Sequence, residues 1–273
     1  MEGGGRDTMG KYKDDNVYCF DLQADEATFV MTGDWHIGAQ GSFFEKAMDK
    51  IAKAFPNAYY LFLGDFVDFA IKNSVGDVYS ARISPQEQLT IVASVFSKYK
   101  DRILGVVQGN HDARIGREVG LDPIRQICDM FGIPYGSSYL VVDVNFKLPA
   151  RIKQRSNITF ALHHGISGGR SKTASVRQGE YFERFITAGV DVYVTGHTHR
   201  PTITPFSHRI YDRAAKKVRY EEGYLITVSS MLDDEEYALR KMLEPTSFKL
   251  PIVKVKYTEG GRDVAAVLVD LPE

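Results

Sequence analysis

The chain has 273 residues, of which 44% are hydrophobic and 25% are charged. That composition is typical of a soluble globular protein with enough apolar material for a core, and it excludes fibrous and disordered classes. The formal net charge of −1 excludes a uniformly basic surface, so any nucleic-acid partner would need a local basic patch.

The cysteine content and the N-terminal segment bear on the cellular compartment. The two cysteines, Cys19 and Cys128, lie far apart, and residues 1–15 contain no apolar signal core. No apolar run approaches the roughly 18 residues that a membrane span needs. We therefore expect a reduced, cytoplasmic protein without a membrane segment. Because no clear linker interrupts the chain, we also expect one domain over residues 1–273.

In the first part of the chain, strand-like runs alternate with helical patterns. Runs rich in β-branched and aromatic residues predict strands at 28–31, 59–63 and 103–107. Apolar residues at helical spacing predict a helix over 44–55, between the first two of these runs. A second helix is expected before the third run, because Ser84 is followed by Pro85 and Glu87, which is the pattern of a capping box.

The alternation continues to the end of the chain. Asp122 and Pro123 open a helix that ends before Gly132, a residue suited to the left-handed conformation after a helix. Another helix is expected over 181–188, and further strands at 158–162, 190–194 and 224–228. Two last runs flank a glycine turn and predict a C-terminal β-hairpin, at 252–257 and 264–268. Strands and helices in this order indicate an α/β sheet protein.

Five short polar segments stand at the ends of apolar runs. They are Gly33-Asp34-Trp35-His36, Gly64-Asp65-Phe66-Val67-Asp68, Gly109-Asn110-His111-Asp112, His163-His164-Gly165 and Gly196-His197-Thr198-His199. One such segment alone would be a weak signal, because glycine followed by aspartate or asparagine is common in turns. All five at the ends of strand-like runs are hard to explain as turns.

The spacing within these segments suits metal binding. Residues two apart in an extended chain point to the same side, so Asp34 and His36 can reach one ion, as can His197 and His199. Open α/β sheets hold their ligands at the carboxyl ends of the strands, where these groups are expected to converge. Carboxylate, imidazole and amide donors without thiolate suit Mn, Fe, Zn or similar ions.

Taken together, the segments resemble the signature of the calcineurin-like metallophosphoesterase superfamily over about residues 28–202. The resemblance implies an α/β fold of two sheets in an αββα sandwich, with helices outside, a dinuclear metal site at the sheet ends, and residues 203–273 completing the sandwich. It also implies hydrolysis of a phosphoric ester. We expect two divalent ions, with Mn²⁺ preferred and Fe, Zn, Co or Ni possible.

The resemblance also implies a role for each motif residue. One ion would be held by Asp34, His36, Asp65 and His199, and Asp65 would bridge to a second ion held by Asn110, His163 and His197. His111 would protonate the leaving group, and Asp68 would orient a catalytic or metal-binding histidine. Either His163 or His164 could be the ligand, but the pattern His-x-Gly favours His163 and leaves His164 for the substrate.

Two further motif residues have ordinary structural explanations. Asp112 is expected to cap a helix or to pair with an arginine, because aspartate at a strand-to-helix turn usually caps. Trp35 could stack on a ring of the substrate, and a role in packing is at least as well founded.

A local basic segment brackets the fourth motif. Residues 147–177 contain seven Lys or Arg residues and no Asp or Glu. This is either a solvated surface or a contact for substrate phosphates through Arg170, Lys172 and Arg177. Through these residues the substrate could be DNA or RNA.

The choice among ester substrates depends on two positions. The superfamily's Ser/Thr protein phosphatases carry arginines where this chain has Phe69-Ala70 and Gln108, so a site that grips a phosphomonoester dianion is not expected. The third and fourth segments resemble those of the superfamily's nucleases and nucleotide phosphodiesterases. The resemblance therefore implies a phosphodiesterase of one of these kinds, with a small-molecule phosphomonoesterase or nucleotide hydrolase as the alternative. A scaffold without catalysis is a third, weaker hypothesis, because every expected ligand position and the His111 position are occupied.

Overall fold

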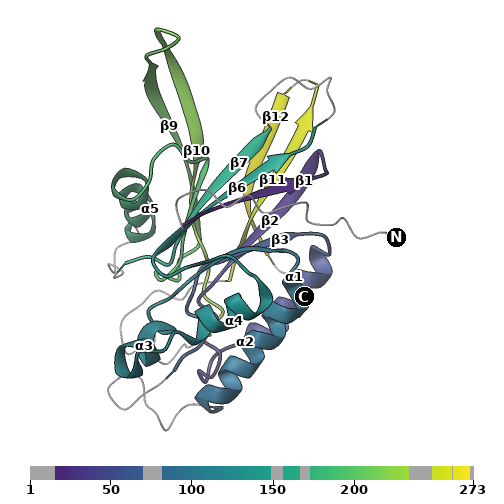
Figure 1. The fold of residues 1–273 in the computed structure, drawn as a ribbon, viewed down its shortest axis with the longest axis vertical. Coiled ribbons are helices and arrows are strands. Elements are labelled where there is room, and N and C mark those ends of the chain that lie inside the picture. The colour runs from purple at the N-terminus through teal and green to yellow at the C-terminus, as the bar shows by residue number, and fades with distance from the viewer. Residues whose placement is uncertain are drawn as a thin grey trace.

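The computed structural model describes residues 16–69, 82–148, 156–166, 173–233, 248–259 and 261–270. Within these residues the strands form two six-stranded sheets. The sheets pack face to face, with helices on their outer sides (Figure 1). This arrangement confirms the predicted α/β sandwich.

The first sheet has the strand order β12-β11-β2-β3-β4-β5. Its strands are β2 (Glu26–Thr32), β3 (Tyr59–Phe62), β4 (Ile103–Val107), β5 (Tyr135–Gly136), β11 (Leu250–Thr258) and β12 (Gly261–Val269). The strands from β2 to β5 run parallel, and β11 pairs antiparallel with both β2 and β12. The predicted C-terminal hairpin is therefore confirmed and extends this sheet beyond β2.

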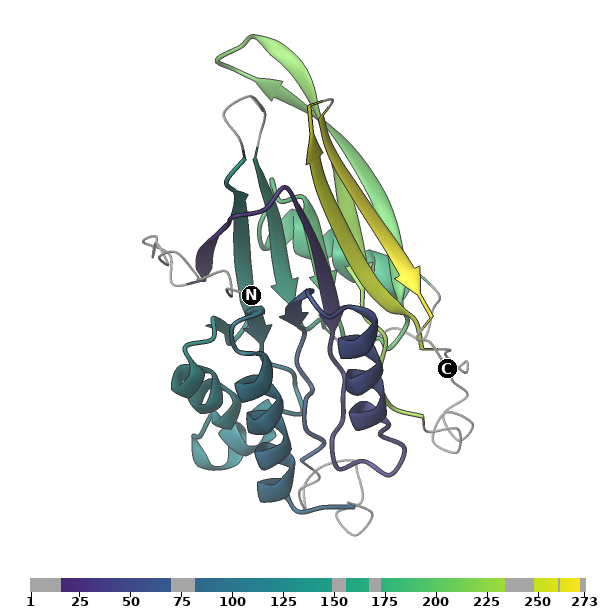
Figure 2. The same ribbon diagram turned by 90° about the vertical axis from the view of Figure 1, so that its right-hand side faces the viewer.

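The second sheet has the strand order β1-β6-β7-β8-β10-β9. Its strands are β1 (Val17–Leu22), β6 (Tyr139–Phe146), β7 (Asn157–His163), β8 (Val192–Thr195), β9 (Thr202–Asp212) and β10 (Lys217–Thr227). β7, β8 and β10 run parallel, so their carboxyl ends share one edge. The hairpin of β9 and β10 extends past the other strands (Figure 2).

Alternation of side chains along the strands separates two apolar layers. In β2, Phe29 and Met31 point into the layer between the sheets, whereas Val30 points outward to the helices. The outer layer is covered by α1 (Phe44–Ala54), α2 (Pro85–Tyr99) and α4 (Pro123–Phe131). The short helix α3 (Ala113–Val119) follows β4, and α5 (Ala174–Phe185) covers the outer face of β8 and β10 (Figure 1).

The helix ends follow the expected chemistry. Ser84 and Glu87 form a reciprocal capping box at the start of α2, with the Ser84 backbone N–H donating to Glu87 Oε2 at 2.8 Å. Asp122 caps α4 by accepting from the Arg125 backbone N–H at 3.0 Å, and Gly132 follows that helix with a φ of 65°. Both predicted helix starts are confirmed.

Some elements differ from the prediction. α5 begins at Ala174 rather than at residue 181, because Gly179 lies within the helix and interrupts its apolar pattern. A Cβ on Gly179 would lie 3.1 Å from Leu225 Cβ, so the glycine lets the helix approach β10 closely. Strands β1, β5, β6 and β9 and helix α3 were not predicted. None of the helices in the described ranges is long and apolar enough to cross a membrane.

Candidate metal centre

The polar segments meet where the parallel strands of the two sheets end. Asp34 and His36 follow β2, Asp65 follows β3, and His197 and His199 follow β8. Backbone bonds hold the loops of the first sheet together, since the Asp34 N–H donates to the Gly64 carbonyl at 2.8 Å. The Asp34 carboxylate joins the two sheets, because its Oδ2 accepts from the His197 N–H at 3.0 Å.

These loops are held in an unusual backbone conformation. Five of the sequence-predicted ligands have positive φ: Asp34 (50°), His36 (47°), Asp65 (52°), His197 (68°) and His199 (58°). Residues other than glycine rarely adopt this left-handed conformation, and each instance costs of order 1 kcal/mol. Strain concentrated on the residues that carry the donor atoms indicates that the fold is organised around this site.

One group of donors consists of Asp34, His36 and His199, whose donor atoms lie within 4.8 Å of one another. His199 Nε2 lies 3.4 Å from Asp34 Oδ1 and 3.2 Å from His36 Nε2. Two imidazole nitrogens at that separation beside a carboxylate have the spacing of ligands that share one cation. Burial, together with the neighbouring His111 and His199, lowers the pKa of His36 to about 3, so its ring is neutral and can act as a ligand.

A second group consists of Asp65, His164 and His197, also within 4.8 Å of one another. His164 Nε2 lies 3.3 Å from Asp65 Oδ2 and 3.1 Å from Asn110 Oδ1, so the asparagine amide oxygen joins this group. Burial alone would lower the pKa of His164, but the Asp65 carboxylate raises it to about 10.

The burial and the partners of the two carboxylates show whether this set of side chains fits metal ions. Asp34 and Asp65 are almost completely buried, with exposures of 0% and 1%. Among the described residues the ion-pair partners of both, at 4.0 Å or less, are histidines. Buried carboxylates need compensating positive charge, and divalent ions with oxygen and nitrogen ligands supply it. The residues therefore fit the two ions that the sequence predicts.

The structure corrects the preference between the two adjacent histidines. His164 points into the second group, and its Nδ1 lies 2.6 Å from the Leu63 carbonyl oxygen. His163 points the other way, since its Nδ1 accepts from the Gly165 N–H at 2.8 Å and its ring packs on Phe182. Consecutive strand residues face opposite sides, and β7 ends so that the second histidine faces the other sheet. His164 therefore replaces His163 among the candidate ligands and is not left facing the substrate.

His111 stands at the side of the centre and is held by Asp68. His111 Nδ1 lies 3.2 Å from Asp68 Oδ1 and 3.1 Å from the Asp68 carbonyl oxygen. His111 Nε2 faces the site and is 4.0 Å from Asp65 Oδ2. Asp68 thus orients the His111 ring, in the arrangement expected from the sequence.

Arg114 is a site residue that the sequence analysis missed. Its Nη2 lies 2.9 Å from His111 Nε2, and its Nη1 donates to the Asp68 carbonyl oxygen. The signal was its spacing, because Arg114 follows His111 by three residues and lies on the first turn of α3. A guanidinium at this place adds a positive charge beside the donor groups.

Asp112 has a different role from the expected helix cap. It is completely buried, and its side chain does not cap α3. Its carboxylate instead accepts backbone N–H groups of the loops after β3 and β4: those of Asp65, Phe66, Val67 and Gly109. Burial and the nearby Asp65 carboxylate raise the pKa of Asp112 to about 7.

The remaining sequence candidates fall into two sets. Trp35 is fully buried, with its ring stacked on Phe44 at 4.4 Å, so it packs in the core and does not face a substrate. Of the expected substrate contacts, Arg177 lies exposed on α5, and Arg170 and Lys172 lie outside the described residues.

Comparison with known structures gives distant likenesses. The chain is similar to Vacuolar Protein Sorting 29 from Cryptosporidium parvum, with 14% identity, coverage of 90% of this chain and 99% of that chain, and a TM-score of 0.39. Vps29 from Chaetomium thermophilum matches with 13% identity, 92% and 100% coverage and a TM-score of 0.38. GAP50, the anchor in the inner membrane complex of Plasmodium, matches with 11% identity, 92% and 90% coverage and a TM-score of 0.38.

No curated protein matches the chain in a sequence comparison. A family model does: the model of the calcineurin-like phosphoesterases matches residues 27–201. This match spans more than half of the chain and includes every candidate ligand described above. The chain therefore belongs to the calcineurin-like phosphoesterase family.

Proposed function

We propose that this chain is a phosphodiesterase that requires two divalent metal ions and acts on nucleotides or nucleic acids. The observation that carries the proposal is the meeting of two buried groups of oxygen and nitrogen donors beside His111, whose ring Asp68 holds. A scaffold without chemistry would not need a histidine held in this way at the edge of the donor groups.

The donor groups divide between the two ions. Asp34, His36 and His199 would hold one ion, Asn110, His164 and His197 would hold the other, and Asp65, which belongs to the second group, would be shared between them. When bound, two such ions polarise a phosphoryl group and lower the pKa of a water molecule that attacks it. Donors of these types suit Mn²⁺ first, and Fe, Zn, Co and Ni ions as well.

His111 and Arg114 are the side chains that would act on the substrate directly during hydrolysis. With Nδ1 directed at Asp68, His111 presents Nε2 to the site, from which it would donate a proton to the departing alkoxide oxygen. Arg114 would bind a non-bridging phosphate oxygen with its Nη2, moving from its contact with His111 Nε2 to do so. The exchange leaves Nε2 of His111 facing the substrate.

The preference for a diester depends on the number of positively charged side chains beside the donor groups. Arg114 is a guanidinium beside the donor groups, at a place where sequence reasoning expected none. One guanidinium matches the single negative charge of a diester better than the dianion of a monoester, which the family's protein phosphatases grip with two arginines. A phosphomonoesterase remains the runner-up, because Arg114 supplies part of that grip.

A substrate comparison tests the proposal. The protein is stripped with EDTA, reloaded with Mn²⁺, and assayed on bis(4-nitrophenyl) phosphate and on 4-nitrophenyl phosphate. We expect no turnover after stripping, recovery with Mn²⁺, and a higher kcat/KM on the diester. A higher kcat/KM on the monoester would select the runner-up, and no turnover on either ester with two bound metal ions would refute both.

A further inference from the structure

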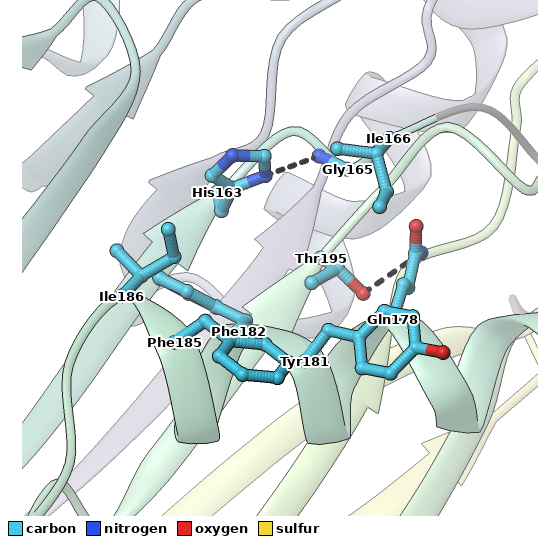
Figure 3. A pocket seen from close by; sticks show the side chains of 9 residues that line it. All are labelled: His163, Gly165, Ile166, Gln178, Tyr181, Phe182, Phe185, Ile186 and Thr195. Carbon is cyan, nitrogen blue, oxygen red and sulfur yellow. Dashed lines mark hydrogen bonds between the residues drawn. The ribbon is translucent and has the colours of Figure 1, made fainter.

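A small apolar pocket opens beside the donor groups. It has a volume of about 190 Å³ and lies between α5 and the ends of β7 and β8. Figure 3 shows Tyr181, Phe182 and Phe185 of α5 on one side of the pocket, with His163 and Ile166 opposite. Among the described residues, no Asp, Glu, Lys or Arg lines the pocket. The pocket therefore does not suit a phosphate.

The pocket lies at the ends of β7 and β8, next to the segments that carry part of the candidate metal centre. His163 lines the pocket, and the next residue, His164, belongs to the second donor group. Thr195 lies on another wall, two residues before His197. Gln178 of α5 contacts this wall, because its Nε2 donates to Thr195 Oγ1 at 3.0 Å and to the Gly196 carbonyl at 2.8 Å. The pocket therefore adjoins the segments that carry His164 and His197.

The exposed rim indicates that the pocket takes a ligand rather than serving the core. Phe185 is 69% exposed and Ile166 is 54% exposed, although both line the pocket. Large apolar side chains gathered at a concave site, with this much surface in water, are typical of binding surfaces. The Tyr181 and Phe185 rings lie 5.8 Å apart at the rim, where they offer π-faces to a planar group.

Gln178 adds a polar preference. Its Oε1 is buried and has no hydrogen-bond partner among the described residues, while its Nε2 is fully engaged. An unpartnered buried acceptor is costly, and an N–H group on an incoming ligand would satisfy it. Aromatic walls with one acceptor suit a nucleobase better than an alkyl chain, which has no N–H to donate.

We infer that this pocket binds the nucleobase of the substrate, with the base against Tyr181 and Phe185 and its phosphate at the metal centre. This inference rests on the proposed function and deepens it, since it makes a nucleotide or a nucleic-acid end the substrate class. The pocket has room for one base, which confines recognition to a single nucleotide beside the reacting phosphate.

Binding of three probes that share one phosphate tests the inference. The Mn²⁺-loaded protein is titrated calorimetrically with deoxyadenosine 5′-monophosphate, deoxyribose 5-phosphate and hexyl phosphate. We expect the nucleotide to bind about 10-fold more tightly than the sugar phosphate, because stacking of a base on aromatic side chains contributes on this scale. Equal affinity for these two probes, or tighter binding of hexyl phosphate than of the nucleotide, would overturn the inference.

Variants locate the effect. Tyr181→Ser and Phe185→Ser change side chains that are 43% and 69% exposed, so the fold should tolerate both. The double variant should bind the nucleotide no better than the sugar phosphate, with its affinity for the sugar phosphate unchanged. Met130→Ser, at a position on α4 that is 72% exposed and not among the pocket residues, is the matched control and should bind all three probes as the wild type does.

The outcome separates this inference from the proposed function. A nucleotide preference that persists in the double variant would mean that the pocket does not bind the base, even if the protein hydrolyses phosphodiesters. A preference that disappears in the double variant, in a protein that hydrolyses no ester, would uphold the pocket and refute the proposed activity.

Discussion

The Asp112 carboxylate accepts a hydrogen bond from the backbone N–H of Asp65 at 2.8 Å, and this contact joins the loops that follow β3 and β4. The same Oδ2 accepts from the Gly109 N–H at 2.9 Å, and Oδ1 accepts from the Phe66 N–H at 2.9 Å. Since Asp65 has a φ of 52°, these contacts hold in place a backbone that would otherwise relax. Asp112 therefore holds the loops that carry the candidate metal ligands, although it is not a candidate ligand itself.

Replacing Asp112 by asparagine should destabilise the protein and loosen the centre. The amide has one acceptor oxygen and would turn its NH₂ group toward two N–H donors, which leaves them unsatisfied in the interior. We expect a loss of about 2 to 4 kcal/mol in the free energy of unfolding, measured with urea in EDTA. Asp129→Asn, at a carboxylate that is 70% exposed, is the control and should change stability by less than about 0.5 kcal/mol. Equal stability of the two variants would contradict this role.

Much of the fold and of the site could be predicted, because hydrophobic periodicity and motifs that begin or end with glycine are local signals in the sequence. The strand-like runs before Asp34, Asp65 and Asn110 are buried on both faces, so their apolar character is continuous and visible in the sequence. β6 alternates between intermediate and buried residues over Tyr139–Phe146, and β9 is largely exposed, so neither strand carries that signal.

What could not be predicted depends on contacts between distant segments. Whether His163 or His164 faces the centre depends on the side to which the end of β7 turns, and this follows from pairing with β6 and β8. Three of the four partners of Asp112 lie in a loop more than 40 residues away in sequence, so its local context suggested a cap or an arginine partner instead. Arg114 was missed because its contact with His111 is visible only once α3 has formed.

The correction in favour of His164 can be tested by metal content. His164→Ala removes a nitrogen that lies 3.1 Å from Asn110 Oδ1 and 3.3 Å from Asp65 Oδ2, so elemental analysis should fall from two bound ions toward one. His163→Ala is the matched control on the neighbouring residue and should retain both ions, because its ring packs on Phe182. Loss of an ion from the His163 variant alone would restore the original preference.

His111 should matter most when the leaving group is poor. His111→Asn keeps a side chain of similar size but cannot donate a proton as an acid, so turnover should fall by roughly 10² to 10⁴-fold on an alkyl leaving group. The loss should be much smaller for nitrophenolate, which departs without a proton. Metal content is measured in parallel and should match the wild type. A loss of equal size for both leaving groups would mean that His111 acts through binding or geometry.

Arg114 should contribute to substrate binding through its guanidinium. Arg114→Ala removes the group that lies 2.9 Å from His111 Nε2, and we expect kcat/KM to fall roughly 10- to 100-fold, mainly through KM. Added guanidinium ion should restore part of the activity. Arg117→Ala, on the same helix but exposed, is the control and should have little effect. A fall in kcat with no change in KM and no rescue would assign Arg114 to positioning His111.

If the substrate is a polynucleotide, the basic segment around the fourth motif should contact its phosphates. Arg170, Lys172 and Arg177 are the basic residues of the acid-free segment that follows the candidate ligand His164, in a chain whose formal net charge is −1. Each phosphate contact on a single strand contributes about 0.7 to the slope of log affinity against log salt concentration. The triple alanine variant should therefore lose about 2 from that slope, measured with single-stranded DNA at several salt concentrations.

A second triple variant separates this segment from a general effect of charge. Arg213, Lys216 and Lys217 lie at the turn of the β9–β10 hairpin, far along the strands from the ends that carry the donors (Figure 2). Replacing these three by alanine removes the same charge, and it should leave the salt slope near the wild-type value. Hydrolysis of the nitrophenyl diester should be nearly unchanged in both variants, because that small substrate needs the metal ions and His111 but no distant phosphate contact. If the hairpin variant lowers the slope and the first variant does not, the nucleic acid contacts the hairpin. If the wild-type protein neither binds nor cleaves DNA, the substrate is a small phosphoester.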